Sequence, residues 1–88
     1  MKAYLHKIAD KYLNRLDAIN KKRIKDAIKK LEKEPPEGDI EPMVGQDGFR
    51  TRIGDFRILW CIEENCIKVT HIDPRGQVYK KKNRENKR

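Results

Sequence analysis

Long hydrophobic runs are absent from this 88-residue chain. No apolar segment is long enough to cross a bilayer, and none resembles the hydrophobic part of a secretory signal peptide. We therefore expect a cytoplasmic protein that does not enter membranes. The length predicts one domain with a modest core, since 36% of the residues are hydrophobic and 41% are charged. Because the apolar residues recur at regular spacings, the composition does not predict disorder.

Cysteine is nearly absent as well. Cys61 and Cys66 flank the predicted turn at residues 63–65, and in a cytoplasmic protein we expect free thiols there rather than a disulfide. No second cysteine pair completes a zinc site, and His6 and His71 lie at no spacing typical of metal ligands. The sequence thus predicts no metal site and no small-molecule cofactor.

Acidic residues are too few to balance the lysines and arginines, and the formal net charge is +8. Basic residues dominate residues 1–34 and 79–88, whereas residues 35–48 carry only acids. A polyanion such as nucleic acid, or an acidic protein, is the natural partner of such a surface. The alternative is a soluble protein whose lysines only interact with water.

Two helices are predicted in the first third of the chain. The first begins at about Lys7, a break follows near residues 17–20 with Asn20 as the expected N-cap, and Pro35-Pro36 ends the second. Both helices have apolar residues at helical spacing, namely Ala9, Tyr12, Leu13 and Leu16 in the first and Ile24, Ala27, Ile28 and Leu31 in the second.

Three strands are predicted after an acidic connection at residues 35–48. They cover residues 49–53, 56–63 and 66–73, and a weaker strand at residues 2–6 would make a fourth. We therefore expect an α+β fold, in which a helical hairpin packs on one face of a small antiparallel sheet of three to four strands. A single domain would span residues 1–79, and the basic tail at residues 80–88 would fray.

Hydrophobes and arginines alternate in the two central strands. Alternation places Arg50, Arg52 and Arg57 on the open face of the sheet, because successive side chains point to opposite faces. The buried row is expected to contain Phe49, Thr51 and Ile53 in the first strand and Phe56, Ile58, Trp60 and Ile62 in the second. Guanidinium groups bind phosphate oxygens bidentately, so the three arginines form a candidate phosphate-binding surface. Alternatively, they only solvate the open face, with Arg57 paired to Asp55 or Glu63.

Three segments of the chain resemble the RelE/ParE superfamily of toxins from toxin–antitoxin modules. They are Gly38-Asp39-Ile40, the central block from Gly48 to Leu59, and Ile72-Asp73-Pro74-Arg75-Gly76-Gln77-Val78-Tyr79. The resemblance implies a RelE-like fold and, for the RelE branch, an endoribonuclease that cuts mRNA on the ribosome. The ParE branch instead inhibits DNA gyrase and does not cut RNA. Either kind is neutralised by a cognate antitoxin protein.

The resemblance also implies roles for individual residues. Arg57 and Arg75 would stabilise the phosphate during metal-free attack by a 2′-hydroxyl, and Tyr79 would orient the reacting nucleotide or stack on a base. Arg50 and Arg52 would bind RNA phosphate. They stand where the best-studied branch has lysines, and arginine is a poor general base because it stays protonated.

Other readings of these residues stay open. Tyr79 would otherwise pack over Leu59 at the sheet edge. His71 is expected to be structural or half-buried, because it alternates with Val69 and Ile67. The lysine-rich helices would be solvated faces, or would steer the protein to ribosomal RNA. A homologue that only binds RNA or antitoxin, without catalysis, is the third functional alternative beside the nuclease and the gyrase inhibitor.

Overall fold

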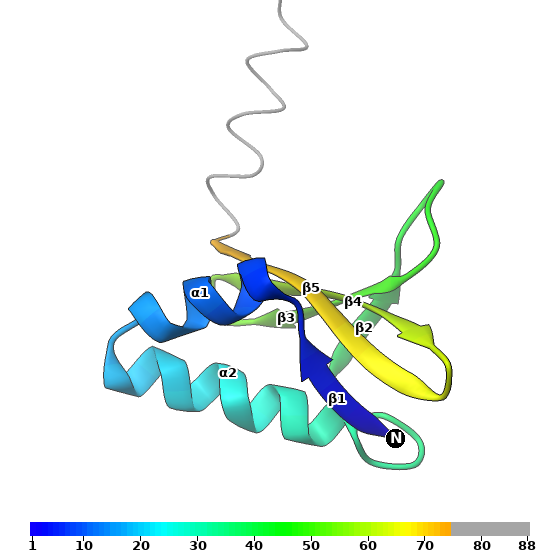
Figure 1. The fold of residues 1–88 in the computed structure, drawn as a ribbon, viewed down its shortest axis with the longest axis horizontal. Coiled ribbons are helices and arrows are strands. Elements are labelled where there is room, and N and C mark those ends of the chain that lie inside the picture. Colours follow the sequence, from blue (N-terminus) through cyan, green and yellow to red (C-terminus); the bar gives the residue numbers. More distant parts are fainter. Residues whose placement is uncertain (75–88) are drawn as a thin grey trace, which may run out of the picture.

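The structure is a computed structural model that describes residues 1–74. A short strand leads into two helices, and four strands follow (Figure 1). The elements are β1 (Lys2–Leu5), α1 (Lys7–Arg15), α2 (Ala18–Leu31), β2 (Asp39–Pro42), β3 (Phe49–Ile53), β4 (Phe56–Glu63) and β5 (Cys66–Pro74). None of these helices is long and apolar enough to cross a membrane.

All five strands belong to one sheet with the order β1-β5-β4-β3-β2. The predicted α+β fold is confirmed, and residues 2–5 supply the expected fourth strand, although β1 runs parallel to β5. The fifth strand, β2, lies in the segment predicted to be a connection. Its Ile40 packs against the core beside Thr51 of β3, so a single inward hydrophobe suffices to fix this short edge strand.

Both helices cover the same face of the sheet (Figure 1). The predicted apolar stripes are confirmed, because they form one core with the inward row of the sheet. Its buried members are Ala9, Leu13, Ile24, Ala27, Ile28, Leu31, Ile58, Trp60, Ile67, Val69 and Ile72. Ile62, expected in the same row, is instead 45% exposed, since the end of β4 extends beyond the helices (Figure 1).

The N-cap of the second helix lies three residues earlier than predicted. Asp17, not Asn20, is the N-cap of α2, and its carboxylate accepts hydrogen bonds from the Asn20 backbone N–H at 3.2 Å and from the Asn20 side chain at 2.8 Å. These bonds, the side-chain bond first, hold the pKa of Asp17 below its usual value. An acidic N-cap also interacts favourably with the positive end of the helix dipole.

The β4–β5 hairpin turns within two residues. Glu64 and Asn65 both have positive φ angles, which matches the right-handed twist of the strands they join. The hairpin carries Cys61 and Cys66, which are both half-buried free thiols in this structure.

One edge of the sheet is held by the end of α2. The backbone N–H of Ala3 in β1 donates to Glu32 Oε2 at 2.7 Å, and the terminal ammonium of Met1 donates to the Glu32 carbonyl at 3.3 Å. Glu32 therefore ties the first strand of the chain to the helix that lies beside it.

A buried polar contact joins β3 to β4 under the helices. The Trp60 indole N–H donates to the Thr51 hydroxyl at 2.9 Å, and both side chains are 2% exposed. The Trp60 ring also stacks on Phe49, with the ring centroids 4.7 Å apart. Indole N–H groups need a partner when they are buried, and here only a hydroxyl-bearing residue at position 51 supplies it.

Replacing Thr51 with Val should therefore lower the free energy of unfolding by about 1–3 kcal/mol, because it leaves a buried indole donor without an acceptor. Thr51→Ser is the matched control, since it keeps the hydroxyl and should lose only about 0.8 kcal/mol for the missing methyl group. Urea unfolding followed by Trp60 fluorescence measures both. Equal losses in the two variants would contradict the importance of the hydrogen bond.

Candidate functional site

The open face of the sheet, opposite the helices, carries the three arginines of the central strands. Arg52 lies directly opposite Arg57 in the β3–β4 register, and Arg50 lies opposite Leu59. Thr51 separates Arg50 from Arg52 in β3, Ile58 separates Arg57 from Leu59 in β4, and both Thr51 and Ile58 are buried in the core. The predicted alternation is thus confirmed, and Arg50, Arg52 and Arg57 share one face.

Arg57 is far less accessible than its position on this face suggested. It is only 6% exposed, whereas the side chains of Arg50 and Arg52 are 29% and 35% exposed. Its cross-strand neighbour on β5 is Asp73. Glu63, one of its two expected partners, forms an ion pair with Lys68 at 3.6 Å. Shortening Arg57 therefore removes a buried side chain, so any test of its role needs a separate measure of stability.

The edge strand β2 brings a carboxylate to the other two arginines. Glu41 Oε1 accepts from Nη2 of Arg50 at 3.1 Å and from its Nε at 3.2 Å, and it lies 3.7 Å from Nη2 of Arg52. Glu41 thus holds both guanidinium groups in place, while each keeps further N–H donors. Glu41 was not predicted from the sequence, because residues 35–48 were expected to form a connection. The alternation of Asp39, Ile40 and Glu41 was the available signal.

The opposite side of the open face is formed by β5. His71 was expected to be half-buried, but it is exposed and lies opposite Leu59 on the open face. The reason is a β-bulge between Leu59 and Trp60, where β5 carries one additional residue. Beyond the bulge, Ile72 takes the buried position and His71 turns outward. The switch of apolar spacing from 67 and 69 to 72 was a signal of this bulge.

The pKa of Tyr12 in α1 depends in part on the charge of Asp73 near the end of β5. Burial raises the pKa of the Tyr12 hydroxyl, and the nearby Asp73 carboxylate raises it further. Both effects disfavour the tyrosinate, first by desolvation and then by repulsion between like charges. Asp73 is therefore within electrostatic range of α1 as well as opposite Arg57.

Two of the predicted site residues, Arg75 and Tyr79, lie outside the described residues. Their roles stay predictions, as does the concave site that they were expected to complete with the three arginines. Within residues 1–74 there is no group of three or more His, Cys, Asp or Glu side chains that could hold a metal ion.

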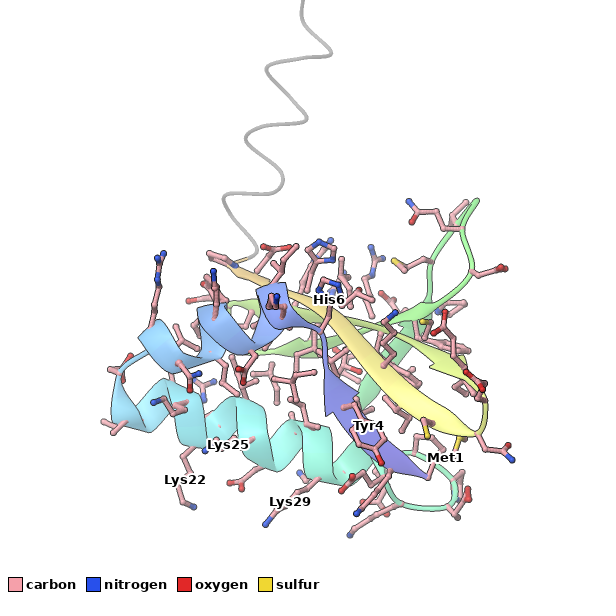
Figure 2. All side chains as sticks on the ribbon, in the orientation of Figure 1. Met1, Tyr4, His6, Lys22, Lys25 and Lys29 are labelled. Carbon is pink, nitrogen blue, oxygen red and sulfur yellow. The ribbon has the colours of Figure 1, made fainter. Side chains whose placement is uncertain are left out.

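Two further surface features lie outside the arginine cluster. A hollow of about 420 Å³ lies where β1 meets the β4–β5 hairpin, and its walls include Tyr4, His6 and Lys68. On the helical side, Lys22, Lys25 and Lys29 project outward from α2 (Figure 2). The solvated lysine face that the sequence predicted for this helix is therefore present.

A family model described as the ParE toxin of the type II toxin–antitoxin system parDE matches residues 1–79. This chain belongs to the RelE/ParE toxin superfamily. It is thus a toxin of a type II toxin–antitoxin system, as the resemblance implied. No curated protein is similar enough in sequence to count as a match.

Solved structures of similar fold agree with this membership. The toxin chain in the RelE–RelB complex from Pyrococcus horikoshii OT3 is 28% identical, with a TM-score of 0.72 over 85% of this chain and 94% of that one. A chain of the RelB–RelE complex from Methanococcus jannaschii is 22% identical, with a TM-score of 0.71 over 86% of this chain and 94% of that one. A chain of the toxin–antitoxin complex RelBE2 from Mycobacterium tuberculosis is 17% identical, with a TM-score of 0.71 over 84% of this chain and 96% of that one. The last two likenesses establish the fold alone.

The contact of Glu41 with two arginines leads to a testable prediction about anion binding at the open face. Glu41→Gln removes a negative charge beside Arg50 and Arg52, so it should tighten binding of a short single-stranded oligoribonucleotide roughly 2- to 5-fold at low salt. Fluorescence anisotropy measures the Kd. Glu37→Gln is the matched control, because it makes the same charge change beside Lys33, off the open face. Equal effects of the two substitutions would mean that net charge alone, not this face, sets the affinity.

The coupling of Tyr12 to Asp73 is also testable. Asp73→Asn should lower the pKa of Tyr12 toward its usual value, while the increase caused by burial remains. Tyrosinate absorbance followed against pH reports the change, and Tyr12→Phe identifies the signal of this residue. Asp55→Asn, at the exposed β3–β4 turn, is the control. An unchanged titration of Tyr12 in Asp73→Asn would contradict the electrostatic contact.

Proposed function

We propose that this toxin is an endoribonuclease that cuts mRNA on the ribosome and so inhibits translation. The observation that carries the proposal is the set of three arginines in register on the open face of the sheet. Cleavage by an attacking 2′-hydroxyl passes through a phosphorane with developing negative charge, and preorganised cations stabilise that charge. Arg57 is the most buried of the three, so its charge acts where water screens it least.

The other arginines have a binding role in this proposal. Arg50 and Arg52 are partly exposed and fixed by Glu41, which suits them to hold the phosphates on either side of the scissile bond. Arg75 would supply a second stabilising cation, and Tyr79 would position the reacting nucleotide. The net charge of +8 favours an approach to ribosomal RNA.

A cognate antitoxin is the expected protein partner. The solved relatives from Pyrococcus horikoshii and Methanococcus jannaschii are complexes of RelE with RelB. We propose that an antitoxin of this chain presents acidic side chains to the open face, since the half-exposed guanidinium groups of Arg50 and Arg52 would pair with them.

Inhibition of DNA gyrase is the second candidate function. The observation that favours it is the family model itself, which describes ParE toxins and matches residues 1–79. As the resemblance implies, a toxin of the ParE branch would leave mRNA intact. The two candidates therefore differ in a directly measurable product.

Primer extension on a defined mRNA in a purified translation reaction separates these functions. New 5′ ends that appear only with ribosomes support the nuclease. Arg57→Gln should slow their formation by about 100- to 1,000-fold, which is the usual loss when one preorganised electrostatic group is removed. Arg75 and Tyr79 variants belong in the same series.

The controls follow from the burial of Arg57. Circular dichroism and thermal unfolding show whether Arg57→Gln is folded, and Arg15→Gln, at the exposed end of α1, provides the same charge change away from the site. Wild-type rates in a folded Arg57→Gln would remove Arg57 from the mechanism. Intact mRNA together with inhibited supercoiling would establish the gyrase inhibitor. Intact mRNA with active gyrase would favour a homologue that only binds.

A further inference from the structure

The β-bulge in β5 places the side chain of His71 on the open face of the sheet. Ile67 and Val69 point into the core, and regular alternation would send residue 71 there too. Thr70 is the additional residue at the bulge, and its hydroxyl donates to the Leu59 carbonyl at 3.2 Å. The irregularity thereby has its own hydrogen bond, and it turns an imidazole toward the arginines. Bulges that redirect a side chain in this way are common beside active sites.

The register places His71 next to the phosphate-binding residues. His71 lies opposite Leu59, and the adjacent cross-strand pair on the same face is Asp73 with Arg57. Diagonal neighbours in an antiparallel pair are roughly 7–8 Å apart, within reach of long side chains. Arg50 lies on the other side of Leu59. Leu59 thus forms a small apolar floor with His71 on one side and Arg50 on the other.

The groups around His71 differ in what they can do with a proton. On the open face its neighbours are Arg57 on β4, Arg50 on β3 and Asp73 on its own strand. At the end of β1, the His6 backbone N–H donates to the carbonyl of Val69, two residues before His71. Arginine does not release its proton under ordinary conditions, whereas imidazole gains and loses one near neutral pH. His6 is engaged elsewhere, because its Nδ1 accepts the Ile8 backbone N–H at 3.2 Å and caps α1.

We propose that His71 is the general base of the cleavage reaction, an inference that rests on the proposed nuclease function. The imidazole removes the proton of the 2′-hydroxyl, and the 2′-oxygen forms a bond to the adjacent phosphorus. The bond from phosphorus to the 5′-oxygen breaks, and that oxygen takes a proton from solvent. The products are a 2′,3′-cyclic phosphate and a 5′-hydroxyl. Arg57 stabilises the negative charge that develops on the phosphate oxygens in the transition state. In this mechanism His71 transfers the proton, so the lysines that the best-studied branch has in place of Arg50 and Arg52 are not needed for that step.

His71→Gln tests the proposal in single-turnover cleavage of mRNA on programmed ribosomes. The rate should fall about 100-fold or more, the usual contribution of a general base, while the affinity for ribosomes stays within 2-fold. The wild-type rate should rise with pH as a general base becomes deprotonated, and the variant should lose that rise. In His71→Ala, added imidazole should restore part of the rate. His6→Asn is the matched control, because asparagine can also cap a helix.

The outcomes distinguish this inference from the function on which it rests. If wild-type toxin cuts mRNA and folded His71→Gln cuts within 3-fold of it with the same pH profile, His71 is not the base and the nuclease function stands. If the rate falls but imidazole gives no rescue and the pH profile is unchanged, His71 is structural and the proposal is overturned. If wild-type toxin leaves mRNA intact under all conditions, the proposed function fails and the role of His71 fails with it.

Discussion

The hydrogen bond from the Trp60 indole to the Thr51 hydroxyl is the contact on which the open face depends. It is made in the core at 2.9 Å, and it is satisfied in only one register of β3 against β4. A slip of one residue would turn every side chain of a strand to the other face. The arginines would then point under the helices and the hydrophobes toward water. The buried polar pair therefore reinforces the hydrophobic alternation that keeps the guanidinium groups on the open face.

Charge on the open face is balanced rather than uniformly basic. Glu41 lies between Arg50 and Arg52, and Asp73 lies opposite Arg57. Such neighbours reduce the long-range attraction for polyanions but hold the guanidinium groups in fixed orientations. The lysines that project outward from α2 lie on the helical side of the toxin, away from the sheet, and one of them, Lys22, is paired with Asp26 at 3.5 Å (Figure 2). The lysines and the arginines therefore lie on different faces of the molecule.

Much of the fold was predictable from the sequence, because the relevant signals are periodic. The apolar stripes around Leu13 and Ile28 and the alternation around Ile58 each repeat often enough to define an element and its buried face. The strand β2 was not predicted, since four residues with one inward hydrophobe carry little signal. The exposure of His71 was missed because a bulge interrupts the alternation of β5, and the burial of Arg57 was missed because it depends on tertiary neighbours. Alternation states which face a side chain occupies and says nothing of how deeply its neighbours cover it.

The contact between Glu32 and β1 has a consequence for the solubility of the toxin. Edge strands with free backbone donors invite pairing with another chain and so promote aggregation. Glu32 occupies the N–H of Ala3 on one edge, while the other edge ends in Pro42, which has no N–H to offer. Neither border of the sheet is a good template for a further strand. The sheet is in this way protected against extension by strands from other copies of the chain.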